Sequence, residues 1–249
     1  MRRQAAVLLC AALLAGCSGV AAERPGTGDD RARDPARGVH DPRRLPPVVD
    51  RVATREPVVF LTYDDGAERD PRFVGLVRER RLPVSMFLTD SVVGPGYGHF
   101  ARLRAVGASI QNHTLDHPAL RGLPYAGQRA EICGQQHKLR SRFGIVPRLF
   151  RPPYGTYDTT TLRAAADCGI TAVVLWRASL NADGELAYAR GEPGLRPGDI
   201  VSVPSAETGP PTLAERTARL LREIEARGLR VGRLEDHLEK TPARRAAAN

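Results

Sequence analysis

The 249-residue sequence predicts an α/β fold built on a parallel sheet, with a barrel as the favoured form. Short apolar runs alternate with amphipathic segments over residues 56–240, which is the pattern of strand–helix repeats. Glycines stand between an expected helix and the next expected strand, as helix C-terminal caps do. They are Gly107, Gly144, Gly169 and Gly228. An open doubly wound sheet is the alternative, but no glycine-rich phosphate loop follows the first expected strand.

The expected strands are short runs rich in aliphatic and aromatic residues. They cover residues 58–62, 84–88, 109–111, 149–151, 171–175, 200–203 and 229–231. Amphipathic helices are expected in the gaps, at residues 71–81, 100–106, 124–143, 159–168 and 213–227. The last of these places apolar side chains on one face, as a helix packed against a sheet does.

The N-terminal segment has the features of a secretion signal. Arg2 and Arg3 precede an apolar run over residues 5–15 that is too short to cross a bilayer. The run ends in Leu-Ala-Gly-Cys, which resembles the lipobox of a bacterial lipoprotein, so residues 1–16 are expected to be removed and Cys17 lipidated. An ordinary secretory signal with a chance cysteine is the alternative. The expected location is extracytoplasmic, with the chain anchored to the cell membrane.

Residues 17–55 are rich in Gly, Pro, Arg and Asp and have no apolar period, so we expect a flexible linker there. Residues 241–249 are expected to form a disordered tail. After processing, Cys133 and Cys168 remain as a pair in an oxidising compartment. A disulfide and two buried free thiols both stay open, because spacing alone does not establish geometry.

The net charge of +9 comes almost wholly from arginine, since Lys138 and Lys240 are the only lysines. A basic surface favours anionic cell-wall polymers or lipid head groups. The sequence has no nucleic-acid-binding module and no stripe of basic and aromatic residues, so we expect no nucleic-acid partner. We expect a monomer whose partner is a cell-wall or environmental polysaccharide.

Three short segments place chemically active side chains at the ends of expected strands. Asp64 and Asp65 follow the first strand, His113 and His117 follow the third, and Arg151 ends the fourth. Barrel active sites gather at these carboxyl ends. Two histidines and one carboxylate leave a metal with open positions, and a second carboxylate beside them is a ready general base. A non-haem iron oxygenase uses the same ligand set, but usually on an all-β scaffold, so a hydrolase is favoured.

Each segment is ambiguous by itself, because Asp-Gly pairs, surface histidines and Pro-Pro turns are common. Pro118 argues against a helix at His117, so a loop is expected there. Together, the segments 62–66, 113–118 and 151–155 resemble the motifs of the NodB-homology polysaccharide deacetylases, carbohydrate esterase family four. The resemblance runs from about residue 58 to residue 238. It implies a distorted (β/α)7 barrel that removes acetyl groups from N-acetylated polysaccharides such as peptidoglycan or chitin-like glycans, or from O-acetylated ones.

The resemblance also implies a division of roles. Asp65, His113 and His117 would hold a divalent metal, usually Zn²⁺, with Co²⁺ as another candidate. Such a metal acidifies water and polarises the acetyl carbonyl. Asp64 would be the base, and Arg151 would keep it ionised and oriented.

Two further residues are implied on the substrate side of the site. The backbone N–H of Tyr154 would help to hold the oxyanion, and Tyr154 would also contact the substrate. Trp176 matches the tryptophan of the fourth family motif, an apolar wall beside the acetyl group. Core packing is the alternative for this tryptophan.

The sequence departs from the family where the leaving group should be protonated. Pro204 stands where a histidine is expected, and residues 177–179 lack the acidic residue that follows the tryptophan. Loss of a general acid typically slows a reaction by about 10²–10⁴-fold. Glu207 and Asp183 are the candidate replacements. The alternative is a catalytically impaired glycan-binding lipoprotein.

Overall fold

The computed structural model describes residues 45–181, 183–204 and 210–239, all within one compact unit of the chain. Residues 1–44, 182, 205–209 and 240–249 lie outside the described residues, and with them the expected signal peptide, lipidated Cys17, Glu207 and the C-terminal tail. Within the described ranges, no helix combines the length and the apolar character that crossing a bilayer requires.

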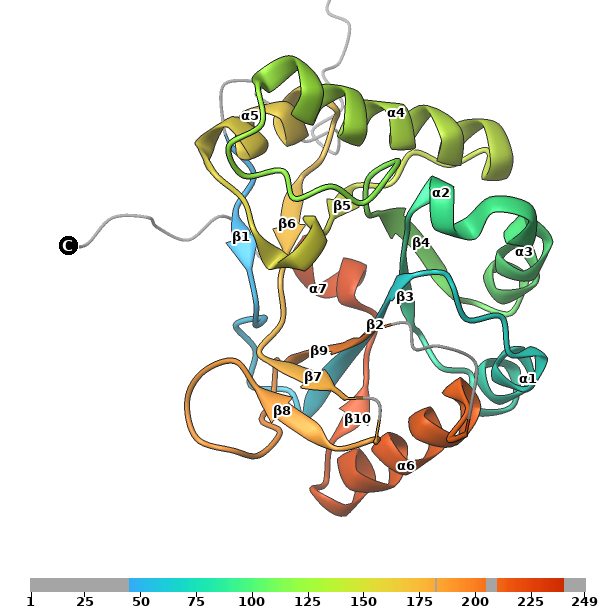
Figure 1. Ribbon diagram of the computed structural model, residues 1–249. Coiled ribbons are helices and arrows are strands. Elements are labelled where there is room, and N and C mark those ends of the chain that lie inside the picture. The colour runs from blue at the N-terminus through green and yellow to red at the C-terminus, as the bar shows by residue number, and fades with distance from the viewer. Residues whose placement is uncertain (1–44, 182, 205–209, 240–249) are drawn as a thin grey trace, which may run out of the picture. The chain divides into compact units, whose positions relative to one another are not determined.

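One curled sheet forms the centre of the fold (Figure 1). Its strand order is β1-β6-β5-β4-β3-β2-β9-β7-β8, with β10 paired to β2 off this path. The strands are β1 Val48–Val49, β2 Val58–Asp65, β3 Ser85–Leu88, β4 Ser109–Asn112, β5 Leu149–Phe150, β6 Ala172–Val174, β7 Ala178–Leu180, β8 Leu186–Tyr188, β9 Ile200–Val203 and β10 Arg230–Val231. Neighbours along the path run parallel, except for the β7–β8 hairpin. The predicted barrel of distorted (β/α) type is confirmed.

Helices lie around the sheet and separate successive strands from β2 to β6, whereas β6, β7, β8 and β9 follow one another without a described helix between them (Figure 1). They are α1 Pro71–Arg80, α2 Asp90–Val93, α3 Tyr97–Ala105, α4 Tyr125–Phe143, α5 Thr159–Asp167, α6 Leu213–Ala226 and α7 Leu234–Glu239, with short 3₁₀ turns at Gly94–Gly96 and Pro153–Gly155. Local chemistry sets their ends. Asp158 and Thr212 form capping boxes at the starts of α5 and α6, and Gly144 ends α4 in the left-handed region.

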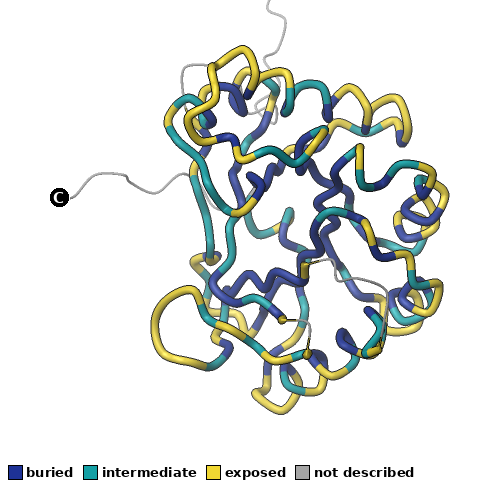
Figure 2. Tube along the Cα trace, in the orientation of Figure 1, coloured by how far each residue is buried: buried dark blue, intermediate teal, exposed yellow. Residues whose placement is uncertain are grey.

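The core lies on both sides of the sheet. Strand residues are buried almost throughout except in β1, β8 and β10, whereas exposed residues concentrate on the outer helix faces and the loops (Figure 2). The largest apolar cluster packs the outer face of β2 and its neighbours against α1, α3 and α6, with Phe73, Phe100 and Leu220 among its members. A second cluster inside the curl includes Phe60, Phe87 and Ile200. Burial on both faces explains why β2 reads as a continuous apolar run rather than an alternating one.

The structure corrects three expectations about the elements. Residues 45–55, assigned to the linker, belong to the fold, because β1 pairs with β6 and Val52 is buried. The first predicted strand is longer than expected, since β2 pairs with β3 as far as Asp65. The seventh predicted strand, seen as β10, joins β2 outside the main path, and the unpredicted β7 takes the place beside β9.

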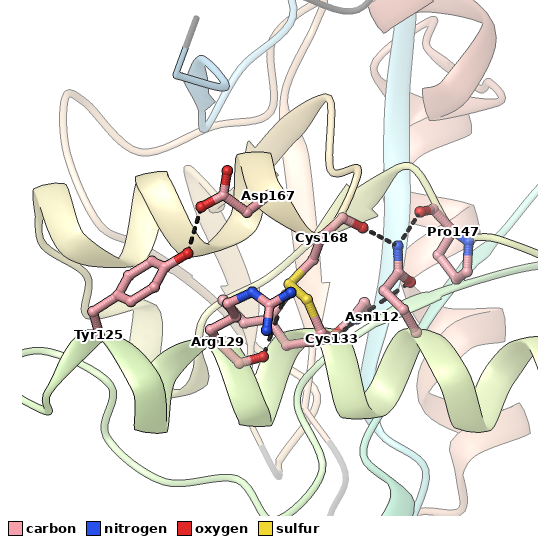
Figure 3. Close-up of a disulfide and its surroundings, with 9 residues drawn as sticks. Asn112, Tyr125, Arg129, Cys133, Pro147, Asp167 and Cys168 are labelled. Carbon is pink, nitrogen blue, oxygen red and sulfur yellow. Dashed lines mark hydrogen bonds between the residues drawn. A yellow bond between two sulfur atoms is a disulfide. The ribbon is translucent and has the colours of Figure 1, made fainter. Parts of the chain in front are cut away.

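A disulfide joins Cys133 of α4 to Cys168 at the end of α5, with the two Cα atoms 5.0 Å apart (Figure 3). The structure thus selects one of the two alternatives that the sequence left open for this pair. The hydroxyl of Tyr125 donates to Asp167 in the same helix pair, at 2.5 Å. The two helices are therefore tied together covalently and by a hydrogen bond on the outside of β4, β5 and β6.

Candidate active site

Three side chains from two strand ends converge at the carboxyl edge of the sheet. Asp65 ends β2, and His113 and His117 follow β4. Oδ1 of Asp65 lies 3.1 Å from Nε2 of His117 and 3.4 Å from Nε2 of His113. The two Nε2 atoms are 3.2 Å apart. A metal bound at about 2.0–2.1 Å by three tetrahedrally placed atoms separates those atoms by about 3.3 Å, so this triangle has the size of a metal centre.

The protonation of His113 shows that these atoms suit a cation. Nδ1 of His113 lies 2.7 Å from the carbonyl oxygen of Arg151. A carbonyl oxygen only accepts, so Nδ1 is the donor and the lone pair of the neutral ring stays on Nε2. That lone pair then faces the Nε2 atom of His117 and a carboxylate oxygen. Three electron-pair donors directed at one point are the arrangement that a divalent metal satisfies, with a backbone carbonyl orienting one imidazole.

The electrostatics of Asp65 agree with a ligand role. Burial opposes ionisation of this carboxyl, but hydrogen bonds and positive charge from the two imidazoles, which act when a proton rather than a metal lies between these atoms, outweigh burial and hold its pKa well below the usual range. The carboxylate is therefore ionised at neutral pH, as a metal ligand must be. Its backbone has a φ of 64°, and His117 has a φ of 59°. Two of the three candidate ligands thus sit in the left-handed region, where backbone strain often accompanies a functional site.

A second network lies beside the triad and contains Asp64. Oδ1 of Asp64 accepts a 2.6 Å hydrogen bond from Nη1 of Arg151, and Oδ2 accepts one of 2.6 Å from the hydroxyl of Ser202. Because the carbonyl of Arg151 also bonds His113, one residue connects both halves of the site. Ser202, on β9, was missed from the sequence. Its one available signal was a hydroxyl within an otherwise apolar strand.

Arg151 is fully buried and held on all sides. Its Nε and Nη2 atoms donate to the carbonyls of Val174 and Leu175, each at 3.2 Å. The guanidinium carbon lies 4.4 Å from the centroid of the Phe87 ring and 5.4 Å from that of Trp176. Trp176 is therefore placed over the arginine that holds Asp64. This position is compatible with both expected roles of the tryptophan, as a wall of the site and as a packing residue.

The turn after Arg151 presents an exposed aromatic ring. Tyr154 is 66% exposed, has a φ of 58°, and its ring centroid lies 4.8 Å from that of His117. At the next position, a Cβ on Gly155 would lie 3.1 Å from Trp176, so glycine allows the tryptophan to approach this turn. Tyr154 thus lies beside His117, and Trp176 lies beside the Arg151 that holds Asp64.

At the positions where the family resemblance implies a histidine and an acidic residue, the described chain has Pro204 and residues 177–179 without a carboxylate. Pro204 follows β9 directly and is exposed. Arg177, the first of the residues 177–179 among which the acidic residue is missing, is buried and directed away: its Nε donates to Asp199 at 2.7 Å and its Nη1 to the carbonyl of Arg190 at 3.1 Å. Asp183 is exposed on a turn between β7 and β8.

Comparison with known proteins places these features in context. A family model described as polysaccharide deacetylase matches residues 51–173. An uncharacterised protein of Streptomyces coelicolor is 68% identical over 225 residues, which is 90% of each chain. The chitin deacetylase of Amylomyces rouxii is 36% identical over 118 residues, covering 46% of this chain and 27% of that protein. The chain therefore matches about a quarter of the length of this fungal relative.

Solved structures share the fold at low identity. A peptidoglycan N-acetylglucosamine deacetylase aligns with a TM-score of 0.67 at 19% identity, covering 78% of this chain and 94% of that one. A pseudoenzyme of carbohydrate esterase family 4 from Bacillus anthracis aligns with a TM-score of 0.65 at 20% identity, covering 78% and 70%. Proteins with this fold thus include both a deacetylase and a pseudoenzyme.

Proposed function

Because this chain belongs to the polysaccharide deacetylase family, carbohydrate esterase family 4, we propose that it is a metal-dependent hydrolase of N-acetylated polysaccharides. The observation that carries the proposal is the convergence of Asp65, His113 and His117 next to the Asp64–Arg151 pair. Such a site joins a metal-ligand set to a carboxylate held in a single orientation. Peptidoglycan and chitin-like glycans are the proposed substrates.

The protein's residues divide the chemistry between them. A divalent metal, Zn²⁺ for preference, would be held by Asp65, His113 and His117, and would supply Lewis acidity toward water and the acetyl carbonyl. Asp64 would take the proton from the attacking water, because Arg151 and Ser202 hold its carboxylate in place.

The substrate side of the site is formed by the turn after β5 and the segment after β6. We propose that the Tyr154 backbone N–H donates to the developing oxyanion and that Trp176 excludes water beside the acetyl group. The exposed ring of Tyr154 would contact the sugar, which suits a polymer that binds along a surface. Ester deacetylation is the variant reaction within the same proposal. An alkoxide leaves with less help from a general acid than an amine does, because the amine leaves poorly as an anion.

The residues at the positions where the leaving group should be protonated favour a second candidate function. Arg177 donates its hydrogen bonds to Asp199 and to backbone carbonyls, and the side chain of Pro204 has no proton to donate. A protein with this arrangement would bind N-acetylated glycans without turning them over. The fold match with a family 4 pseudoenzyme supports keeping this candidate.

An acetate-release assay separates the two candidates. Purified protein, loaded with zinc or cobalt, is incubated with N-acetylglucosamine oligomers and with acetylated xylan. The hydrolase proposal expects acetate from at least one substrate, no release by Asp64→Asn at unchanged metal content, and loss of metal in Asp65→Asn. Glycan binding by wild-type protein without any acetate release would favour the binding protein.

We also propose that the domain acts outside the cytoplasm, anchored to the membrane by a lipid on Cys17. The support is the lipobox-like segment at residues 14–17. Cys17→Ser should release the protein from the membrane fraction or block processing. A mature N-terminus elsewhere, without acyl mass on Cys17, would contradict this part of the proposal.

A further inference from the structure

The loop that carries both candidate histidine ligands has a strained backbone. Thr114 has a φ of 73° and His117 a φ of 59°. A β-branched residue such as threonine rarely adopts a positive φ, because this region of backbone conformation is strained. The loop therefore needs outside contacts to keep this shape. Two contacts are local, since Thr114 N–H donates to Asn112 at 3.0 Å and the Thr114 hydroxyl accepts from His117 N–H at 3.1 Å.

The other contacts come from α4, whose residues no motif of the site includes. Oε2 of Glu131 accepts two backbone hydrogen bonds from the middle of the loop, 3.1 Å from Leu115 N and 3.0 Å from Asp116 N. A carboxylate that accepts backbone N–H bonds forms a charge-assisted hydrogen bond, which is stronger than a neutral one. One side chain thus holds the segment that separates His113 from His117.

Gly134 gives the same loop a place to pack. One helical turn after Glu131, a Cβ at Gly134 would overlap the Cδ1 atom of Leu115 and lie 3.1 Å from its Cγ. The Leu115 side chain therefore lies directly against the α4 backbone. On the other side, the carbonyl of Leu115 accepts from Ser91 N–H at 2.9 Å. Leu115 is consequently held from α2 and from α4 at once.

We infer that Glu131 and Gly134 are positioning residues for metal binding: α4 holds the Leu115–Asp116 segment so that both imidazoles meet Asp65. This inference rests on the proposed metal-dependent function, and it assigns a role to a helix that contributes no ligand. Groups that orient metal ligands typically change metal affinity by about 10–100-fold when they are removed. Gly134 is also a helix-interior glycine, which destabilises a helix relative to alanine, and the approach of Leu115 explains why glycine stands there.

The test measures zinc affinity by competition with a chromophoric chelator, and the visible spectrum of the cobalt form. Glu131→Ala should weaken zinc binding about 10–100-fold and alter the cobalt spectrum. Glu131→Gln should recover most of the affinity, because its amide oxygen can accept the same two N–H groups. Gly134→Ala should weaken zinc binding several-fold even though alanine favours the helix. Arg129→Ala, at an exposed position of the same helix, is the matched control.

Amide hydrogen exchange in the metal-free protein provides a readout that does not depend on the metal. The Leu115 and Asp116 amides should be protected in wild-type protein and should exchange faster in Glu131→Ala. If wild-type protein binds no zinc but these amides behave as expected, the metal proposal fails, whereas the hold of Glu131 on the Leu115–Asp116 segment stands. Zinc affinity in Glu131→Ala or Gly134→Ala equal to that of the control, or equal losses in Glu131→Ala and Glu131→Gln, would overturn the inference.

Discussion

Replacement of Arg151 tests whether the Asp64–Arg151 contact is a true buried pair. Arg151→Met keeps an apolar stem but removes the guanidinium. The buried Asp64 carboxylate then loses a 2.6 Å charge-assisted bond, and the Val174 and Leu175 carbonyls lose their donors. The side chains of Arg151 and Asp64 are only 0% and 9% exposed, so solvent does little to replace what is lost.

The expected loss is large. Removing one partner of a buried ion pair costs about 3–5 kcal/mol, because the other charge stays buried without compensation. At about 2–4 °C per kcal/mol for a domain of this size, the melting temperature should fall by about 6–20 °C. Asp64→Asn in the same chain should recover part of this loss, since it removes the uncompensated charge. We expect a coupling energy between the two positions of about 0.5–3 kcal/mol.

The assay is urea denaturation of the four proteins of this double-mutant cycle, with melting curves as a second measurement. The Arg80–Glu225 pair is the matched control, since its side chains are 59% and 60% exposed and its nitrogen and oxygen lie 3.5 Å apart. Arg80→Met should cost no more than about 1 kcal/mol. A similarly small loss in Arg151→Met, or purely additive effects of the two substitutions at the site, would refute the buried-pair reasoning.

Three further predictions concern stability and the incomplete half of the site. The double variant Cys133→Ser, Cys168→Ser should lose up to about 4 kcal/mol of unfolding free energy, because the bond closes a loop of 35 residues; a denaturation midpoint equal to that of wild type would contradict this. Burial, and next the neighbouring arginine charges, lower the pKa of His99 below its ordinary 6.5, so the unfolded chain binds this proton more readily. Stability should therefore fall as the pH drops below about 6.5, and His99→Phe should flatten that slope in denaturation curves measured from pH 7.5 to 5; parallel slopes would exclude His99 as the cause. Pro204→His should raise N-deacetylation more than ester cleavage in the acetate assay, because an imidazole there can protonate a departing amine; a slower variant beside a fully active wild type would mean that another group is the acid.

Local sequence patterns anticipated much of the fold. The strand–helix alternation and the capping residues predicted β2, β3, β4, β5, β6, β9 and β10 and the helices α1, α3, α4, α5 and α6, because periodicity and caps are properties of neighbouring residues. The hairpin of β7 and β8 and the N-terminal β1 were missed. Each of these strands is only two or three residues long, which is too short to show an alternating apolar pattern. Each forms a strand because another strand supplies its hydrogen bonds.

The candidate site likewise contains residues that the sequence could propose and residues whose arrangement depends on distant partners. Asp65, His113 and His117 could be proposed from the sequence as metal ligands, because strand ends in a parallel fold meet at one edge and the two histidines share one loop. The direction in which the Arg177 side chain points could not be predicted from the sequence. Whether a side chain at that position enters the site or turns toward Asp199 depends on which surroundings satisfy its charge.

Sequence by itself therefore determined the fold class, and it proposed the ligand types and a base at Asp64. The tertiary structure decided what holds that base: Arg151, 87 residues away, and Ser202, 138 residues away. It also decided that Glu131 of α4 holds the loop that carries His113 and His117. Hydrogen bonds between such distant residues leave no periodic trace in the chain, because they form only once packing has brought separate elements within about 3 Å of each other.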